Sequence, residues 1–522
     1  MRISLRNTFT AIGSTLLVGS LVACQASPGP APVEEAPPTT TETTAEAQPV
    51  EEEEIKPGRT EVNIGIDPLR NGFNPHLLAD DAATVRDIAS LVLPSAFVGN
   101  QMNTDLLEDV ATVEPAEGVA QTVRYIIAQE AQWSDGTPIT GSDFAFLRRA
   151  ITNTPGTFNR AGYQAISAIR TSGGGKTVDV DFTEPVAQWH QLFSHLLPSH
   201  LIQDAGEGFR TALYDAIPAS AGRYMVRAID RQRGMITLSR NDRFWGERPA
   251  TIELLTFHDA RSTSRAGEFL RTGQSVFMNL RPTETLVDTF NLLPGTDVRV
   301  SDTDRTLELV LNTNSEALGT PAQRAKIFEL IDVPLTARLA TGRSANLSVA
   351  KESTYQVDGE ATEITGPLRF AVDPADDQSV AAGRVVVDML AAAGIEASTV
   401  TTDLGSMLKD GLPAGDIDGV ITRTRNATGV LSLADRYGCE LALSGWCDPE
   451  TENYLDQLMA GTIEFDPTWS EQLNAQQALT LPIVHENRVE ARTTGIVGPT
   501  EDVAAWPGGI ASASNWRKNE TG

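Results

Sequence analysis

Strand patterns and amphipathic helix patterns are interspersed along the chain from Thr60 onward, and this mixture restricts the fold more than any other feature of the sequence. Val62, Ile64 and Ile66, for example, alternate with polar or small residues, as they would in a half-buried strand. No segment recurs at the period of about 20 to 50 residues that marks a solenoid. The sequence therefore predicts an α/β protein.

Local signals place individual elements. Thr140 or Ser142 can cap a helix, Gly394 ends a helix pattern, and Gly173-Gly174-Gly175 joins two strand patterns in a hairpin. We expect helices over residues 84–92, 142–151, 322–331 and 379–393, and strands over residues 60–66, 122–128, 165–170, 178–182, 223–227, 235–239, 307–311 and 368–372.

At 522 residues the chain is too long for a single hydrophobic core, so we expect two or more lobes. Hydrophobic residues make up 41% of it, which is enough for most of the chain to be globular. It holds 41 Lys and Arg against 69 Asp and Glu, a formal net charge of −28. A surface this acidic repels phosphate backbones, which argues against a nucleic-acid partner.

The first 23 residues have the pattern of an export signal. Arg2 and Arg6 precede an uncharged apolar run from Thr8 to Ala23, which is too short and too interrupted to span a membrane comfortably. The run ends in Leu21-Val22-Ala23-Cys24, where small side chains would fit a signal peptidase and the thiol would accept a diacylglycerol. We therefore predict a lipoprotein signal over residues 1–23 and lipidation of Cys24; the alternative is a free cysteine at the end of a secretory peptide.

A polar segment follows the lipidation site. From Gln25 to Pro57 there are seven prolines, eight glutamates and no aromatic residue, a composition that cannot bury enough apolar surface to fold. We predict a disordered tether over residues 24–59. Diacylglycerol supplies two acyl chains, enough to hold the protein stably on the outer face of the cell membrane.

Cys439 and Cys447 are the other two cysteines of the chain. Outside the cytoplasm, two thiols eight positions apart are more typical of a small-loop disulfide than of a metal or redox site. We therefore expect these two residues to be joined.

Four segments carry motifs that occur in a particular order: Trp133-Ser134-Asp135-Gly136-Thr137-Pro138, Ala221-Gly222-Arg223-Tyr224 with Asn241 to Gly246, Leu311-Asn312-Thr313-Asn314, and Cys447-Asp448-Pro449-Glu450. In this order they resemble the family 5 extracellular solute-binding proteins, which include the oligopeptide- and dipeptide-binding components of ABC importers. Each motif also has a structural explanation, because Ser134-Asp135-Gly136 is a turn and Trp133 is a typical packing residue. The motifs therefore indicate a fold and leave the binding site open.

The resemblance implies two α/β lobes with a ligand cleft between them, the type II periplasmic-binding-protein-like fold. From the order of the motifs we place lobe I over residues 60–283, lobe II over 284–479 and a return to lobe I over 480–522. The resemblance also implies a binding protein and not an enzyme: a monomer that serves an ABC permease and binds a small molecule, a peptide or a glycolipid. No cofactor and no metal are expected.

One stretch departs from the peptide-binding pattern. Where those relatives usually offer an aromatic residue and an aspartate for the amino terminus of a peptide, this chain has Arg423 and Arg425. A guanidinium suits phosphate, carboxylate or sugar hydroxyls and repels an ammonium group. The alternative is that both arginines are solvated at the end of a strand.

With Gly72-Phe73-Asn74-Pro75-His76 and Leu91-Val92-Leu93-Pro94, this departure is similar to a narrower subgroup, the LpqW-type actinobacterial lipoproteins. That subgroup is associated with lipomannan and lipoarabinomannan assembly and is named for binding an acylated phosphatidylinositol mannoside. The resemblance therefore implies a second hypothesis, a factor in envelope assembly.

The candidate ligand contacts fall in three places. An early loop offers amide and imidazole groups for hydroxyls and a ring for stacking, and a later strand end faces it with guanidinium and amide groups. Beside the cysteines, a tryptophan is either a stacking platform or a packing residue. The residues are Asn71, Phe73, Asn74, His76, Arg423, Arg425, Asn426 and Trp446.

Enzyme motifs are weak. Gly173-Gly174-Gly175-Lys176-Thr177 mimics the end of a phosphate-binding loop, but Arg170 stands where the first glycine is required. His190, His195 and His200 are five apart, so one face of a helix cannot present all three to one metal. The sequence contains neither HExxH nor GxSxG. A hydrolase built on paired carboxylates is the third hypothesis.

Overall fold

The computed structural model describes residues 60–202, 206–359, 363–364, 366–500, 502, 505–506 and 508–519. The signal peptide, Cys24 and the tether, which we predicted over residues 1–59, lie outside the described residues. Within the described part, no helix is long and apolar enough to cross a membrane.

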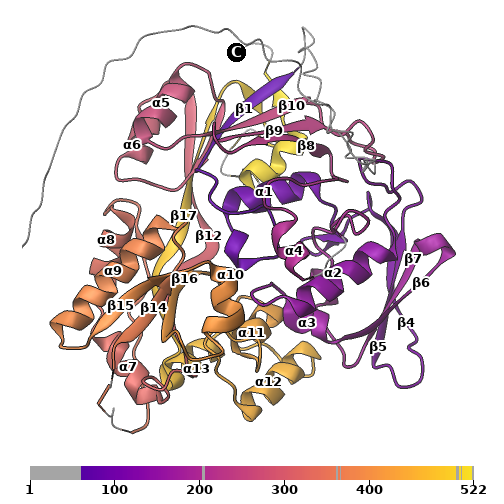
Figure 1. Ribbon diagram of the computed structural model, residues 1–522. Helices are drawn as coiled ribbons and strands as arrows, with labels where there is room; N and C mark the ends of the chain where they lie inside the picture. Colours follow the sequence, from indigo (N-terminus) through magenta and orange to yellow (C-terminus); the bar gives the residue numbers. More distant parts are fainter. Residues whose placement is uncertain are drawn as a thin grey trace, which may run out of the picture. The chain divides into compact units, whose positions relative to one another are not determined.

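A mixed sheet of eleven strands organises the folded part of the chain (Figure 1). Its order is β15 (Ala397–Thr401), β14 (Leu368–Val372), β16 (Gly419–Arg425), β12 (Thr296–Leu311), β17 (Thr480–Thr493), β11 (Phe277–Leu280), β1 (Glu61–Ile66), β10 (Leu254–Asp259), β9 (Met235–Arg240) and β8 (Tyr224–Asp230), with β13 (Ser348–Val349) paired to β17. The long strands β12 and β17 run antiparallel and connect the two ends of this sheet. The pairing explains why residues near the C-terminus lie beside strand β11.

A second sheet of four antiparallel strands has the order β4 (Leu107–Val113), β5 (Gln121–Ile127), β7 (Thr177–Phe182) and β6 (Ile166–Ser172). The expected hairpin is present, because the 3-10 turn η2 (Gly173–Gly175) joins β6 to β7. Two short pairs, β2 (Phe97–Val98) with β3 (Gln101–Met102) and β18 (Ile496–Val497) with β19 (Arg517–Lys518), complete the sheets.

The helices cover the sheets. They are α1 (Ala83–Val92), α2 (Gly141–Asn153), α3 (Arg160–Gln164), α4 (Glu207–Thr211), α5 (Thr263–Arg271), α6 (Leu286–Asn291), α7 (Pro321–Glu329), α8 (Val333–Thr341), α9 (Asp377–Ala392), α10 (Leu404–Ser406), α11 (Val430–Tyr437), α12 (Pro449–Met459) and α13 (Trp469–Gln477). Short 3-10 turns are η1 (Leu78–Asp80), η3 (Trp189–Gln191) and η6 (Gly509–Asn515), and η4 (Met407–Gly411) is a π-helical turn.

Local signals in the sequence account for several boundaries. Thr140 caps α2, as expected: its hydroxyl accepts from Ser142 N–H at 3.3 Å, while Asp143 accepts from Thr140 N–H at 3.0 Å. Helix α9 packs on β14, β15 and β16. Gly394 follows it at a φ of 80°, a conformation that glycine adopts without strain.

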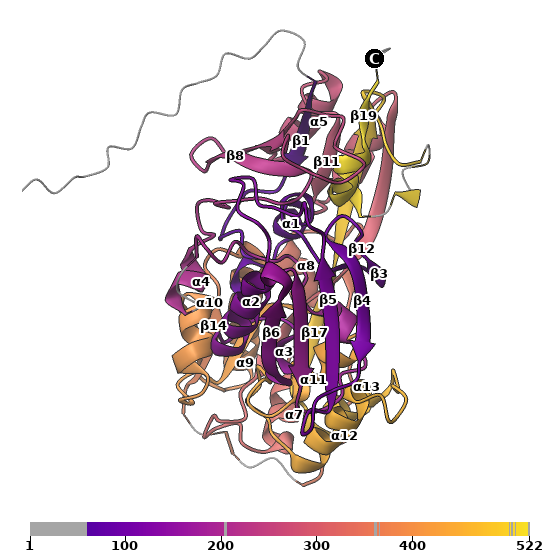
Figure 2. The same cartoon turned by 90° about the vertical axis from the view of Figure 1, so that its right-hand side faces the viewer.

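The largest hydrophobic core joins distant parts of the chain. It contains Trp133 and most buried apolar residues between Val62 and Phe277, and also those of α11 and α12. The C-terminal segment joins it through Trp516, whose ring centre lies 4.9 Å from that of Phe277. Figure 2 shows this segment, in yellow, at the same end of the structure as β11. The packing of α11 and α12 with this core crosses the boundary that we placed at residue 283. The lobe boundaries themselves stay a prediction.

Candidate functional site

A cavity of about 360 Å³ is lined by segments that are far apart in the sequence. One part of its wall is residues 155–160, which follow α2 and end at the first residue of α3, together with Leu78. The other part comes from η4, the end of β16, α11 and residues 440–445. The volume falls in the range of about 300–1,000 Å³ that is typical of ligand pockets. Of the lining residues, sequence reasoning indicated only Arg425 as a ligand contact; it did not indicate residues 155–160, although Pro155-Gly156 is a turn signal.

Aliphatic side chains make up much of the wall. Leu408 on η4 packs close to Gly156, so closely that a Cβ at Gly156 would lie 2.4 Å from the Leu408 side chain. Gly156 also has a φ of 75°, which favours glycine. The aliphatic residues of the wall are Leu78, Val310, Leu408, Leu412, Leu441, Leu443 and Leu479.

An ion pair between Glu308 and Arg436 forms a polar part of the cavity wall. Glu308 on β12 is only 2% exposed, and its carboxylate accepts from Arg436 at 2.6 Å and from the Thr424 hydroxyl. Burial disfavours the Arg436 charge, but the Glu308 carboxylate more than offsets this and raises the pKa of Arg436 above its usual value. The two charges neutralise each other and leave a polar surface with little net charge.

Asp435 on α11 ties that helix to α3. Its carboxylate accepts from the backbone N–H groups of Arg160 at 3.2 Å and Ala161 at 2.9 Å. Burial raises the pKa of Asp435 to about 6, and these backbone donors oppose the shift only in part. The contact holds two parts of the cavity wall together.

Arg425, a predicted ligand contact, lines the cavity and pairs with Asp81, which lines the second cavity described below. Its guanidinium donates to Asp81 at 2.7 Å and lies 3.5 Å from the ring centre of Phe158. The Asp81 side chain is fully buried and also meets Arg305 at 3.0 Å. Burial raises the pKa of Asp81, but the surrounding arginines hold it well below its usual range.

A second cavity, of about 110 Å³, is lined by both charged and apolar residues, and Arg423 and Glu486 are among the charged ones. Arg423, the other arginine predicted as a ligand contact, is only 4% exposed. Its guanidinium donates to Asp376 and to Gln378. It also lies 3.4 Å from Glu486. Burial opposes the charge of Glu486, but Arg305 and its neighbours lower the pKa of Glu486 to about 2. The alternative that both arginines are solvated at a strand end is therefore wrong, because both are paired with acids.

The early loop is held by its own side chains. Phe73 and Asn74 are buried, and the Asn74 amide donates to Phe209 O at 2.8 Å. His76 contacts His195 O at 2.9 Å, and burial lowers the pKa of His76 to about 4. None of these three side chains lines either cavity, so ligand contact through them stays a prediction.

Two amides of the predicted set also have protein partners. Asn71 lines the second cavity and donates to Ala79 O at 2.6 Å and to Asp373 at 3.1 Å. Asn426 accepts from the Thr306 hydroxyl at 2.7 Å and lines neither cavity.

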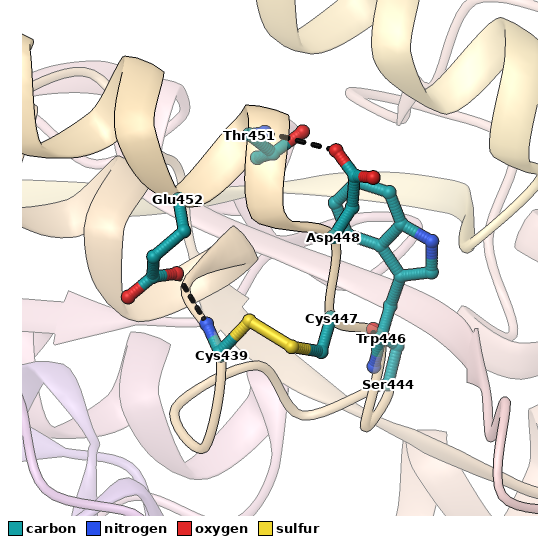
Figure 3. The surroundings of a disulfide bond; sticks show 7 residues. All are labelled: Cys439, Ser444, Trp446, Cys447, Asp448, Thr451 and Glu452. Carbon is teal, nitrogen blue, oxygen red and sulfur yellow. Dashed lines mark hydrogen bonds between the residues drawn. A yellow bond between two sulfur atoms is a disulfide. The ribbon is translucent and has the colours of Figure 1, made fainter.

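The structure joins Cys439 to Cys447 by a disulfide (Figure 3). The Cys439 N–H donates to Glu452 at 2.8 Å, and Asp448 caps α12 by accepting from Thr451 N–H at 2.9 Å. Between the cysteines, residues 440–445 line the larger cavity. Trp446 packs on the main core and is not part of the cavity wall. The disulfide thus anchors both ends of one wall.

The glycine segment that mimics a phosphate-binding loop has a structural role. Gly173–Gly175 forms the hairpin turn described above. Among the residues that the structure describes, no group of three or more His, Cys, Asp or Glu side chains is placed to hold a metal ion.

Comparison with known proteins shows which family the chain resembles. Residues 114–363 match the model of the bacterial extracellular solute-binding proteins, family 5 middle. The probable monoacyl phosphatidylinositol tetramannoside-binding protein LpqW of Mycobacterium tuberculosis is 29% identical over 81% of this chain and 76% of its own length. Over residues 114–363 the chain is similar to the family 5 extracellular solute-binding proteins.

Two further proteins are consistent with this resemblance. The oligopeptide-binding protein OppA of Mycobacterium bovis is 31% identical over 38% of this chain and 35% of its own length. The structure of the Bacillus subtilis oligopeptide-binding protein AppA in complex with a nonapeptide covers 88% of this chain and 100% of its own, with a TM-score of 0.67 at 13% identity. The predicted α/β fold of this family, with two lobes and a cleft, is confirmed.

Proposed function

We propose that this protein is the membrane-anchored binding component of an ABC importer and holds its solute in the 360 Å³ cavity. The observation that carries the proposal is the origin of the wall, because residues 155–160 and 440–445 meet at one cavity although about 280 positions separate them. A guest that touches both segments favours the arrangement in which they are close.

The location is part of the proposal. Diacylglycerol on Cys24 would hold the chain on the outer face of the cell membrane, with residues 25–59 as a tether. The partner would be an ABC permease, and the protein would act as a monomer without turning over its ligand.

A second candidate is a factor in lipoglycan assembly that binds a phosphatidylinositol mannoside. Its support is the similarity to LpqW, which extends over 81% of this chain, whereas the similarity to OppA extends over 38%. Arg423 and Arg425 do not add support, because both are paired with acids. A cavity of about 360 Å³ would hold one part of such a glycolipid.

The test of solute binding is native mass spectrometry of protein purified from its own envelope, followed by calorimetry with the guest that it identifies. Leu443→Trp should fill the cavity and abolish binding. Leu339→Trp, at a position on α8 that is 53% exposed, is the matched control and should bind normally. Equal affinity in the two variants would contradict the proposed site.

Deletion of the gene separates the two candidates. Loss of peptide uptake with normal lipoglycans would support the importer, and altered lipoglycans with normal uptake would support the assembly factor.

A further inference from the structure

The larger cavity has a lining that selects for a particular chemistry. We propose that its guest presents an aliphatic chain to this cavity and that the buried part of the guest is not a sugar ring. This inference rests on the proposed function and narrows the class of ligand.

The first support is uncovered leucine surface. Four leucines of the wall, Leu78, Leu408, Leu441 and Leu443, are only half-buried, although each lines the cavity. They come from η1, η4 and the loop within the disulfide, so three separate segments direct apolar side chains to one place. Removing such surface from water is favourable in proportion to its area, and an aliphatic guest would cover it without leaving any polar group unpaired.

The second support is the state of the aromatic and polar groups. Phe158 could stack on a sugar, but the Arg425 guanidinium lies 3.5 Å from its ring centre. Tyr437 is 4% exposed. The carboxylates of Glu308 and Asp435 already accept from protein donors. These groups already have protein partners and are therefore less available to sugar hydroxyls, and an unpaired buried hydroxyl is costly.

Two sources could supply the aliphatic chain: an acyl chain of a lipid, or leucine-like side chains of a peptide. Both bring CH₂ and CH₃ groups against the same leucines, so the cavity wall favours them alike.

The experiment measures affinity of the purified full-length protein by displacement of N-phenyl-1-naphthylamine, a fluorescent apolar probe. The competitors are octanoic, decanoic and dodecanoic acids, trialanine and trileucine, and mannose and α-mannobiose. If acyl chains enter the cavity, Kd should fall about fourfold for each added CH₂. If peptide side chains enter it, trileucine should bind and trialanine should not.

The variants Leu408→Asn and Leu443→Asn should weaken the binding of the effective competitor about tenfold or more, because an amide would face its chain. Leu339→Asn on the exposed face of α8 should leave it unchanged. Thermal unfolding of each variant shows that it is folded, and either variant alone suffices for the test.

The outcomes distinguish the two levels of inference. Binding of fatty acids or of trileucine, weakened by the cavity variants alone, supports the aliphatic guest and identifies its source. Binding of mannose or α-mannobiose with unchanged affinity in those variants overturns it, while the proposed solute-binding function stands. Failure of every competitor to displace the probe also overturns the aliphatic guest. In that case the proposed solute-binding function is overturned too only if native mass spectrometry finds no bound guest.

Discussion

Arg425 donates to Asp81 at 2.7 Å although the two residues are 344 positions apart in the chain. Asp81 precedes α1, Arg425 ends β16, and the carboxylate between them is completely buried. Arg305 and Arg86 share the same carboxylate, at 3.0 Å and 3.8 Å. One acid therefore holds together segments from both ends of the sequence beside the cavity.

Replacing this acid should destabilise the protein strongly. Asp81→Asn leaves three guanidiniums without their shared counter-ion, and breaking a buried pair in this way costs about 3–5 kcal/mol. The free energy of unfolding in urea measures the loss. Asp304→Asn is the control, because Asp304 pairs with Arg86 at 2.5 Å but is 51% exposed, so its loss should cost about 1 kcal/mol or less. Equal losses in both variants would contradict the role of Asp81.

The stability should depend on pH through Asp87. Burial, and then the charge of Glu490, raise the pKa of Asp87 to about 7. A carboxyl with a higher pKa in the folded state holds its proton longer there than in the unfolded chain. Its contribution to stability is therefore complete below about pH 4 and is lost as the pH rises toward 7.

Asp87→Asn removes this dependence. The free energy of unfolding of the variant minus that of the wild type should be larger at pH 8 than at pH 5. Urea unfolding at both pH values measures this difference. Asp388→Asn, which changes an exposed carboxylate on α9, is the control. Its free energy of unfolding should differ from that of the wild type by the same amount at pH 5 and at pH 8. A pH-independent difference for Asp87→Asn would show that its carboxyl titrates normally.

The disulfide should contribute measurably to stability. Closing a loop between cysteines eight positions apart restricts the unfolded chain by about 2–3 kcal/mol on the loop-entropy model. Cys439→Ser with Cys447→Ser should therefore unfold at lower urea concentration than the wild type. Reductant should lower the urea midpoint of unfolding of the wild type and leave that of the double variant unchanged. An unchanged urea midpoint of the wild type in reductant would contradict this prediction.

The anchor is testable independently of the cavity. Cys24→Ser should move the protein out of the membrane fraction and remove the mass of the acyl chains, because no thiol remains to accept diacylglycerol. The Cys439→Ser and Cys447→Ser variant should stay in the membrane fraction. Retention of Cys24→Ser in the membrane would refute lipidation at this residue.

Much of the fold could be predicted from local patterns. Residues 60–66 were expected as a strand and form β1 (Glu61–Ile66), and residues 379–393 were expected as a helix and form α9 (Asp377–Ala392). Both carry a periodic apolar pattern, and the period of such a pattern depends only on neighbours in the chain. The cap at Thr140 was predictable for the same reason.

The site was not predictable in the same way. The sequence indicated Arg423 and Arg425 as unusual charges, but their partners Asp376 and Asp81 have no local signal that marks them. Phe73, Asn74 and His76 looked available for a ligand because a loop of Gly, Pro and Asn is usually solvated, and here that loop is buried.

The sequence by itself determined the class of elements, the resemblance to a family and the two cysteines expected to pair, because periodicity, motifs and residue type can be read along the chain. Only the tertiary structure decided which charges neutralise one another and which leucines share a cavity. Those relationships join residues 155–160 to 440–445 and Asp81 to Arg425. They depend on distances in space, and the long antiparallel pairing of β12 with β17 is among the contacts that bring distant parts of the chain together.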